Sequence, residues 1–419
     1  MLDFESALAA SAADAGLVPS EDAQEIASVC AAIEPSAAEL GVGTGESGTP
    51  VPALLAALTA RLSPGAGAHL HRGATSQDVL DTAAMLVARR ALAPLLTDLD
   101  AAADACAALA ERHRDTLQVA RTLLQQALPT TFGLTAAGWL TGLDEAASAL
   151  REVRERTLAV QLGGAAGTLA SLGERGVEVA AGVAQRLELA EPTLPWQSNR
   201  MRPALLAGAL GACCGVAGKI GTDVVLLAQT EVAEVAEGAS GGSSTLPHKR
   251  NPVAAVAARA CATRAPSIVA TMLAAMEGEH QRAAGAWQAE AETLSELLGL
   301  TGSAVAAVRS LLEGLEVNAE RMRANLEQTG GLVMGEALTT ALTNSLGRAR
   351  AHQLVQEASR AALEQGASLR EIVVELPEVV EALGEDGIDA ALRPESYLGS
   401  SAELIDRALA AHRARVTGS

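Results

Sequence analysis

The residues with the most chemical potential lie together in GGSSTLPHKRNPV, residues 241–253. Ser244 supplies a hydroxyl, Lys249 a cation and Asn251 an amide, and the two glycines permit backbone conformations closed to other residues. Pro252 suits the first turn of a following helix. A serine, an ammonium and backbone N–H groups close to a helix N-terminus favour carboxylate binding and the stabilisation of negative charge. We therefore expect an anion site here.

Acidic residues are absent from four segments of an otherwise acidic chain. The chain has 50 acidic and 31 basic residues and a net charge of −19, which argues against nucleic acid or an anionic membrane surface as a partner. The acid-free segments are residues 47–77, 116–143, 192–222 and 238–276. Core helices exclude carboxylates anyway. The loops GAGAHLHRGATSQ and GGSSTLPHKRNP are too polar for core, so the pattern also favours a cavity for a small polyanion.

These residues must be positioned mainly by helices. Aromatic residues make up only 1% of the chain, so the core must be built from Ala, Leu and Val, which favours helix packing. Thr75 and Asp78 match a capping box, which predicts a helix from Ser76. Residues 201–238 are predicted to be one helix, with an apolar seam that continues to Glu231. The seam consists of Leu206, Leu210, Cys213, Ala217, Ile220, Val224 and Leu227.

Residues 252–280 and 287–315 have a similar long helical pattern, and no segment shows the alternation of a strand. One chain can hardly cover so much apolar surface, so we expect a bundle shared between subunits. We predict an all-α fold of three helical domains, at residues 1–92, 93–347 and 348–419, with long helices in the central domain.

Several classes of protein are disfavoured. The five cysteines include no C-x-x-C pair, so we expect buried free thiols rather than disulfides or a metal centre. We predict neither a metal nor a cofactor. The N-terminus lacks the basic start of a signal peptide, and no uninterrupted apolar run reaches the roughly 18 residues of a membrane span. We expect a cytoplasmic protein.

Three motifs carry a resemblance to a known family. GGSSTLPHKRNP resembles the signature loop of the fumarase/aspartase superfamily, with Leu246 in place of the usual Met. HRGATSQDVLDTA (71–83) and ARTLLQQALPTTFG (120–133) resemble the other two superfamily regions, in the same order. The resemblance implies a homotetramer with a central helical bundle. It also implies active sites built from three regions on three different subunits, with Ser244 as the catalytic serine.

The second region departs from the superfamily pattern. It usually reads Thr-His, whereas this chain has Thr122-Leu123, and a leucine cannot transfer a proton. The strings QLGGAAGTLASLG, PWQSNR and EHQRAAGAWQAE resemble the 3-carboxy-cis,cis-muconate cycloisomerase family. In that reaction the substrate's own carboxylate closes a lactone, 4-carboxymuconolactone, so the nucleophile has no proton to lose. The resemblance implies a tricarboxylate substrate and a step in protocatechuate breakdown by the β-ketoadipate route.

The resemblance also implies roles for individual residues. Ser244 would donate the proton to carbon, and His71, which aligns with a histidine of the first region, is the second residue expected to be catalytic. Residues expected to bind the substrate are Thr75, Ser76, Gln77, Thr122, Gln126, Lys249, Asn251 and Arg282. His71 could instead make a structural hydrogen bond, and Arg282 a surface salt bridge. Arg200 is a weaker candidate for the site.

Two other functions compete with this interpretation. Adenylosuccinate lyase or a related fumarate-releasing lyase would share the fold, although Leu123 speaks against it. A superfamily scaffold can also persist as an inactive, crystallin-like structural protein. The intact Ser244, Lys249 and Asn251 speak against that second possibility.

Overall fold

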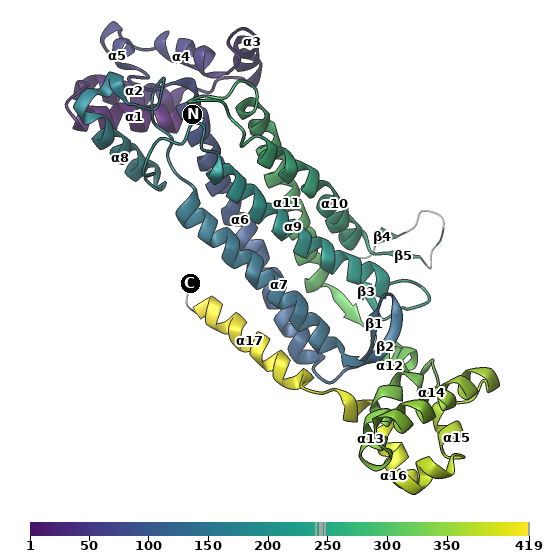
Figure 1. The fold of residues 1–419 in the computed structure, drawn as a ribbon. Coiled ribbons are helices and arrows are strands. Elements are labelled where there is room, and N and C mark those ends of the chain that lie inside the picture. The colour runs from purple at the N-terminus through teal and green to yellow at the C-terminus, as the bar shows by residue number, and fades with distance from the viewer. Residues whose placement is uncertain (239–240, 243–245, 247–248, 418–419) are drawn as a thin grey trace. The chain divides into compact units, whose positions relative to one another are not determined.

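The computed structural model describes residues 1–238, 241–242, 246 and 249–417, and Figure 1 gives the element labels used below. The chain divides into two compact units, each made of three segments. Unit 1 comprises Met1–Thr97, Ala146–Gly215 and Cys261–Ala304. Unit 2 comprises Asp98–Glu145, Val216–Ala260 and Val305–Ser419. The division into three consecutive domains stays a prediction.

Unit 1 begins with short helices that bury a small core. These are α1 (Leu2–Asp14), α2 (Ser20–Ala32), α3 (Ala37–Ser47), α4 (Val51–Thr59), α5 (Pro64–His69) and, later in the chain, α8 (Gly176–Leu187). Ile26, Leu54 and Leu58 are fully buried in this core. Short helices are enough to form this core because each of them buries one apolar stripe against its neighbours.

The described residues form five long helices. They are α6 (Ser76–Arg112), α7 (Phe132–Glu152), α9 (Met201–Leu227), α10 (Val253–Ala274) and α11 (Glu290–Glu313). The predicted start at Ser76 is confirmed, and all seven seam residues of α9 are buried. The predicted extension of this helix to residue 238 is wrong. α9 ends at Leu227, Glu231 lies in a turn, and the chain then enters the strand β3 (Val235–Glu237).

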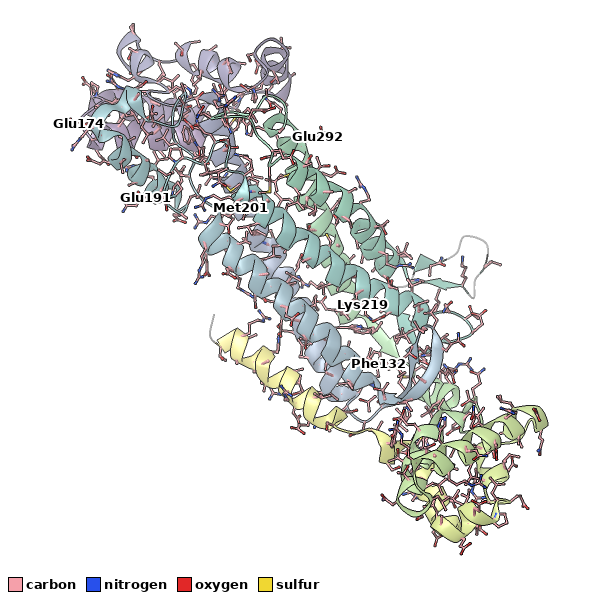
Figure 2. All side chains as sticks on the ribbon, in the orientation of Figure 1. Phe132, Glu174, Glu191, Met201, Lys219 and Glu292 are labelled. Carbon is pink, nitrogen blue, oxygen red and sulfur yellow. The ribbon has the colours of Figure 1, made fainter. Side chains whose placement is uncertain are left out.

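Small residues on α9 allow a close approach to α10. A Cβ added at Gly221 would lie 2.7 Å from the carbonyl oxygen of Ala255, and one at Gly211 would lie 2.7 Å from a methyl of Val269. At Gly215 nothing lies within 4 Å of the added Cβ. Two of these glycines are therefore required by packing. Lys219, labelled on the same helix in Figure 2, is exposed and pairs with Asp223 one turn on.

Unit 2 contains strands that the sequence did not predict. β1 (Leu117–Thr122) pairs with β2 (Gln125–Thr131) as an antiparallel hairpin, β3 pairs with β6 (Leu315–Val317), and β4 (Gly241–Gly242) pairs with β5 (Arg250–Asn251). The prediction of an all-α fold is confirmed, since helices dominate, and these short strands are a detail that the sequence pattern did not show. β3, β4, β5 and β6 have only two or three residues each, and the residues of β1 and β2 do not alternate between buried and exposed, so no alternation is visible in sequence.

The rest of unit 2 is helical. Its elements are α12 (Ala319–Glu327), α13 (Gly335–Leu346), α14 (Arg348–Gln365), α15 (Leu369–Val373), α16 (Pro377–Ala391) and α17 (Ser401–Thr417). Polar contacts fasten α17 to its neighbours: the ring nitrogens of His412 lie 3.0 Å from carboxylate oxygens of Asp104 and Asp144, and Arg415 Nη1 lies 2.8 Å from Asp100 Oδ1.

Two helices in the described part of the chain, α9 and α10, are long and apolar enough to cross a membrane when judged by length and composition. Their average composition passes this test although charged and polar residues interrupt both. In α9, 56% of the most apolar stretch is buried, as expected for a core helix. In α10 the buried share is only 22%, so much of its apolar surface has no cover within one chain.

Candidate active site

The signature loop is closed at its base by the β4–β5 ladder. Gly241 pairs with Asn251 and Gly242 with Arg250, so the loop leaves and returns on adjacent strands. The Arg250 guanidinium donates to both carboxylate oxygens of Glu316, at 3.1 and 3.2 Å. Lys249 is exposed and Asn251 is half-buried. Ser244, the predicted proton donor, lies outside the described residues, as do Ser243 and His248.

The helix N-terminus that follows this loop already has an anion of its own. Glu237, a buried side chain, accepts from the backbone N–H of Ala254 at 3.1 Å and of Ala255 at 2.9 Å. A carboxylate at this position satisfies amides that the first turn of α10 cannot pair internally. These two amides are therefore engaged within the protein, and the expected anion site of the loop stays a prediction that rests on its other donors. Lys249 and Asn251 remain the candidate ligands from this loop.

The first region is fixed by the buried carboxylate of Asp78. It accepts from the backbone N–H of Thr75 at 3.0 Å, which fulfils the predicted capping contact. It also accepts from the backbone N–H groups of Gly163 and Gly164 and from the Gln161 amide, at 2.8 to 3.1 Å. Burial raises the pKa of Asp78 although these hydrogen bonds favour the charged form. Gly164 has φ +71°, and an added Cβ would meet a backbone carbonyl at 2.9 Å, so only glycine fits there.

Gln77 has a different role from the one expected. It is fully buried, and its amide nitrogen donates to Asp81 Oδ2 at 3.2 Å and to the Gln197 carbonyl at 2.7 Å. Both N–H donors are thus used within the protein, and only Oε1 has no partner among the described residues. A lone acceptor does not bind a carboxylate. The predicted donor role of Gln77 is therefore corrected to that of a buried support for the first region.

Two other candidate residues of unit 1 have clear contacts. The exposed Arg282 donates from Nη1 to Thr75 Oγ1 at 2.9 Å, so the structure brings these two predicted binders together. His71 Nδ1 lies 2.7 Å from Oε1 of the buried Glu5, and the backbone of His71 has φ 58°. A carboxylate on one ring nitrogen fixes the tautomer and leaves the other as the basic atom. No sequence signal links Glu5 to His71, because 66 residues separate them.

The second region forms the tip of the β1–β2 hairpin. Thr122 pairs with Gln125 across a two-residue turn, Leu123-Leu124, in which both residues have positive φ, 52° and 65°. Leu123 is 97% exposed and Leu124 is 72% exposed. Gln126 is half-buried, and its amide nitrogen donates to Gln328 Oε1 at 3.2 Å. The hairpin therefore presents Thr122 and two leucines to the surroundings.

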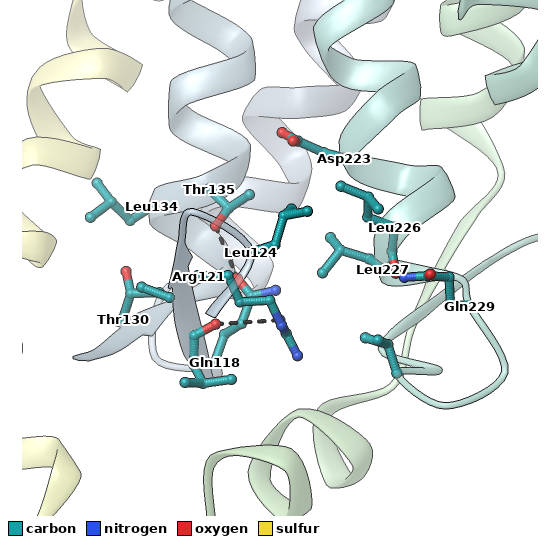
Figure 3. A pocket seen from close by; sticks show the side chains of 13 residues that line it. Gln118, Arg121, Leu124, Thr130, Leu134, Thr135, Asp223, Leu226, Leu227 and Gln229 are labelled. Atoms are coloured by element: carbon teal, nitrogen blue, oxygen red, sulfur yellow. Dashed lines mark hydrogen bonds between the residues drawn. The ribbon is translucent and has the colours of Figure 1, made fainter. Parts of the chain in front are cut away.

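A cavity of about 610 Å³ adjoins this hairpin (Figure 3). Its charged lining residues are Arg121 and Asp223. Arg121 is already paired with the buried Glu234, at 2.6 Å from Nη2 to Oε1, and Gln118 donates to the same carboxylate at 2.9 Å. The cavity therefore has no surplus positive charge, and we do not assign a polyanionic substrate to it.

Arg200 is excluded from substrate binding by its own hydrogen bonds. Its guanidinium donates to both oxygens of Asp81 at 2.8 and 2.9 Å, to both oxygens of Glu290 at 2.8 and 2.5 Å, and to the Gln197 carbonyl at 3.5 Å. These bonds occupy all five donors of an arginine. Arg200 is 3% exposed and lies over the Trp196 ring, 4.9 Å from its centroid. It is a structural residue.

The residues predicted to form the site belong to two different compact units of the chain. Unit 1 holds His71, Thr75, Ser76, Gln77 and Arg282, and unit 2 holds Thr122, Gln126, Lys249 and Asn251. The acid-free sequence segments do not correspond to an acid-free region of space. Several of their cations pair with acids from elsewhere in the chain. These pairs are His69–Asp22, Arg121–Glu234, Arg200–Asp81, Lys219–Asp223, Arg250–Glu316 and Arg264–Glu296.

Comparison with known proteins agrees with the motifs. Residues 2–266 match a protein family described as lyase, and residues 331–408 match the adenylosuccinate lyase C-terminus. The chain belongs to this lyase family, that of the fumarase/aspartase superfamily.

Individual relatives are similar over nearly the whole chain. A 3-carboxy-cis,cis-muconate cycloisomerase of Bradyrhizobium diazoefficiens is 46% identical, covering 98% of this chain and 92% of the relative. A nitrosuccinate lyase of Streptomyces davaonensis is 42% identical, covering 98% and 89%. The crystal structure of the 3-carboxy-cis,cis-muconate lactonizing enzyme from Pseudomonas putida is 40% identical, with a TM-score of 0.93 over 99% of this chain and 94% of that one.

Proposed function

We propose that this protein closes 3-carboxy-cis,cis-muconate to 4-carboxymuconolactone, a step of protocatechuate breakdown. The observation that carries the proposal is the exposed Leu123 at the tip of the β1–β2 hairpin. Superfamily members that expel an amine or hydroxide commonly use a histidine there, and leucine cannot move a proton. A carboxylate nucleophile needs no such residue, and the relatives named as cycloisomerases support the same reaction.

The bond changes balance with a single proton donor. An oxygen of one substrate carboxylate forms a C–O bond to an alkene carbon, and the π bond breaks. Its electron pair moves onto the neighbouring carbon as an aci-carboxylate, and that carbon takes a proton from the Ser244 hydroxyl. Solvent then returns a proton to the serine. Three carboxylates become two carboxylates and an ester, so one proton is taken up from solution in each turnover.

The remaining residues stabilise negative charge during this step. Lys249 and Asn251 would hold the carboxylate that becomes the dianion, since electrostatic stabilisation carries much of the rate effect in such reactions. Thr75, Ser76, Thr122 and Gln126 would contribute further hydrogen bonds. Arg282, already in contact with Thr75, would bind another carboxylate, for which a planar guanidinium is well suited. His71, oriented by Glu5, would complete the first region.

We infer that the active enzyme is a homotetramer whose sites combine residues of different subunits. The proposal is supported by the large uncovered surface of α10, where Val253, Val256 and Leu273 are each at least half exposed. Exposed apolar side chains along a helix that is mostly uncovered within one chain favour packing against another subunit. Light scattering on the purified protein should give about four times the chain mass of 42.5 kDa. An active monomer would refute the shared site.

We also infer a cytoplasmic location. The five cysteines are free thiols in the structure, and such thiols persist in a reducing compartment.

The function is tested by an ultraviolet assay with matched serine variants. Purified protein should remove the conjugated diene absorbance of 3-carboxy-cis,cis-muconate. Ser244→Ala should lower kcat by at least about 100-fold, the lower range of a proton-transfer residue, while Ser243→Ala keeps most of the activity. A loss of less than tenfold in Ser244→Ala would exclude the serine mechanism.

A fumarate-releasing lyase is the second candidate, favoured by the 42% identity to nitrosuccinate lyase. Parallel cuvettes with nitrosuccinate and adenylosuccinate decide between the two. Turnover of either substrate, with none of the muconate, would overturn the cycloisomerase proposal. An inactive structural protein would turn over none of the three.

A further inference from the structure

Unit 1 contains a second cavity, of about 270 Å³. Its walls come from the α3–α4 connection, from α6, from the first residues of α9 and from α11. Pockets that hold drug-sized ligands usually measure about 300 to 1,000 Å³, so this cavity fits a smaller molecule of one ring. Met85, Leu294 and the indole of Trp287 give it largely apolar sides.

One end of this cavity carries an excess of negative charge. The charged residues that line it are Arg200, Asp81 and Glu290, which is one guanidinium against two carboxylates. All three are almost fully buried, with side-chain exposures of 3%, 4% and 7%. Arg200 is thus shared between two carboxylates, so the cluster carries one negative charge when both are ionised.

The carboxylates of Asp81 and Glu290 offer acceptor oxygens to a cation, whereas the single guanidinium of the lining offers no free donor to an anion. Every N–H of Arg200 is engaged, so the guanidinium has no donor left for a carboxylate ligand. The hydroxyl oxygen of Thr49, a lining residue, is buried and has no partner among the described residues. A ligand that forms a hydrogen bond with this hydroxyl satisfies a buried polar group that otherwise has no partner.

We propose that this cavity is a binding site for a small apolar monocation, a primary amine with one aromatic or aliphatic ring. The ammonium would lie against Asp81 and Glu290, and the ring would fill the apolar part that Met85, Leu294 and Trp287 line. The site selects against the anions that the active site is proposed to bind. It does not depend on the proposed function, because no substrate-binding contact enters the argument.

Three isosteric probes test the charge preference directly. Benzylamine, benzyl alcohol and benzoate share a phenyl ring, are of similar size, and carry a positive, a neutral and a negative polar group. By isothermal titration calorimetry on the full chain, benzylamine should bind at least tenfold more tightly than benzyl alcohol, and benzoate should bind most weakly. Trp287 fluorescence should change with the same dissociation constant. Benzoate binding as tightly as benzylamine would overturn the proposal, and so would absence of saturable benzylamine binding at millimolar concentrations.

Two variants locate the site and its charge. Ala84→Leu fills the cavity and should abolish benzylamine binding, whereas Val87→Leu, on the exposed side of the same helix, should leave it unchanged. Glu290→Gln should reduce the benzylamine advantage over benzyl alcohol to about threefold or less. Binding that survives Ala84→Leu, or a charge preference that survives Glu290→Gln, would refute the assignment. Circular dichroism of each variant checks that it is folded.

Discussion

Replacing Arg200 by leucine should destabilise the protein far more than removing a surface arginine. Arg200 lies at the start of α9, holds Asp81 of α6 and Glu290 of α11, and is 3% exposed. Its removal leaves two buried carboxylates without their common cation. Breaking a buried pair in this way costs about 3 to 5 kcal/mol, because the remaining charge stays desolvated. Asp81 would keep only its bonds from Trp287 and Gln77, at 2.9 and 3.2 Å.

The measurement is urea unfolding followed by tryptophan fluorescence at one fixed protein concentration. Arg350→Leu is the matched control, since its guanidinium pairs with Glu378 on the surface at 2.9 Å and screening by solvent leaves such pairs with little net effect. The triple variant Arg200→Leu, Asp81→Asn, Glu290→Gln should recover part of the loss, because it removes the stranded charges. The reasoning fails if Arg200→Leu costs no more than Arg350→Leu.

Three other outcomes are expected. Gly221→Ala should lower the thermal unfolding temperature because its methyl would lie 2.7 Å from a backbone carbonyl of α10, whereas Gly215→Ala has open space and should be neutral or gain up to about 1 kcal/mol of helix propensity. In a thiol titration of the native protein, the half-buried Cys261 should react first, and Cys30, whose pKa burial raises to about 12, should react only on unfolding. Burial raises the pKa of the Glu290 carboxyl, so the folded state binds the carboxyl proton more tightly than the unfolded state does. Protonation of Glu290 therefore favours the folded state. This contribution to stability grows as the pH falls toward the raised pKa and is lost as the pH rises through it. Urea midpoints from about pH 8 down to about pH 5 should therefore change less in Glu290→Gln than in the original protein, and equal changes would contradict the assignment.

The long helices could be predicted because their signal is local. The start of α6 follows from Thr75 and Asp78, which are three residues apart, and the buried face of α9 follows from a regular spacing of apolar residues. The end of α9 could not be predicted in the same way. Val232 and Val235 continue an apolar pattern beyond Leu227, but Val235 is paired with Val317 across 82 residues of chain. A helical period cannot reveal a strand whose partner is so distant.

In the candidate site, too, local sequence signals were predictive and contacts between distant residues were not. The motifs identified the loop, the first region and the hairpin, because those strings are contiguous in sequence. They did not reveal Glu5 behind His71 or Glu237 at the start of α10, since each of these acids lies in another element. The absence of acids from a sequence window proved a weak guide to local charge. Arg121 and Arg250 both lie in acid-free windows, yet Glu234 and Glu316 neutralise them in space.

The hairpin tip connects the proposed reaction with the proposed assembly. Leu123 and Leu124 both adopt the left-handed region, which costs a residue other than glycine roughly 1 to 2 kcal/mol, and both expose most of an apolar side chain. A turn of this shape usually has Asn-Gly or Gly-Gly, which would remove both the strain and the exposed surface. Strain of this kind persists where surrounding structure or function requires it. No described residue of the chain covers Leu123, and the proposed homotetramer supplies a neighbouring subunit that could impose this requirement. In the proposed assembly, a neighbouring subunit would place Thr122 and the two leucines against the substrate. The leucine side chains would then form an apolar surface without a transferable proton. Such a surface suits a carboxylate that adds to a double bond without losing a proton.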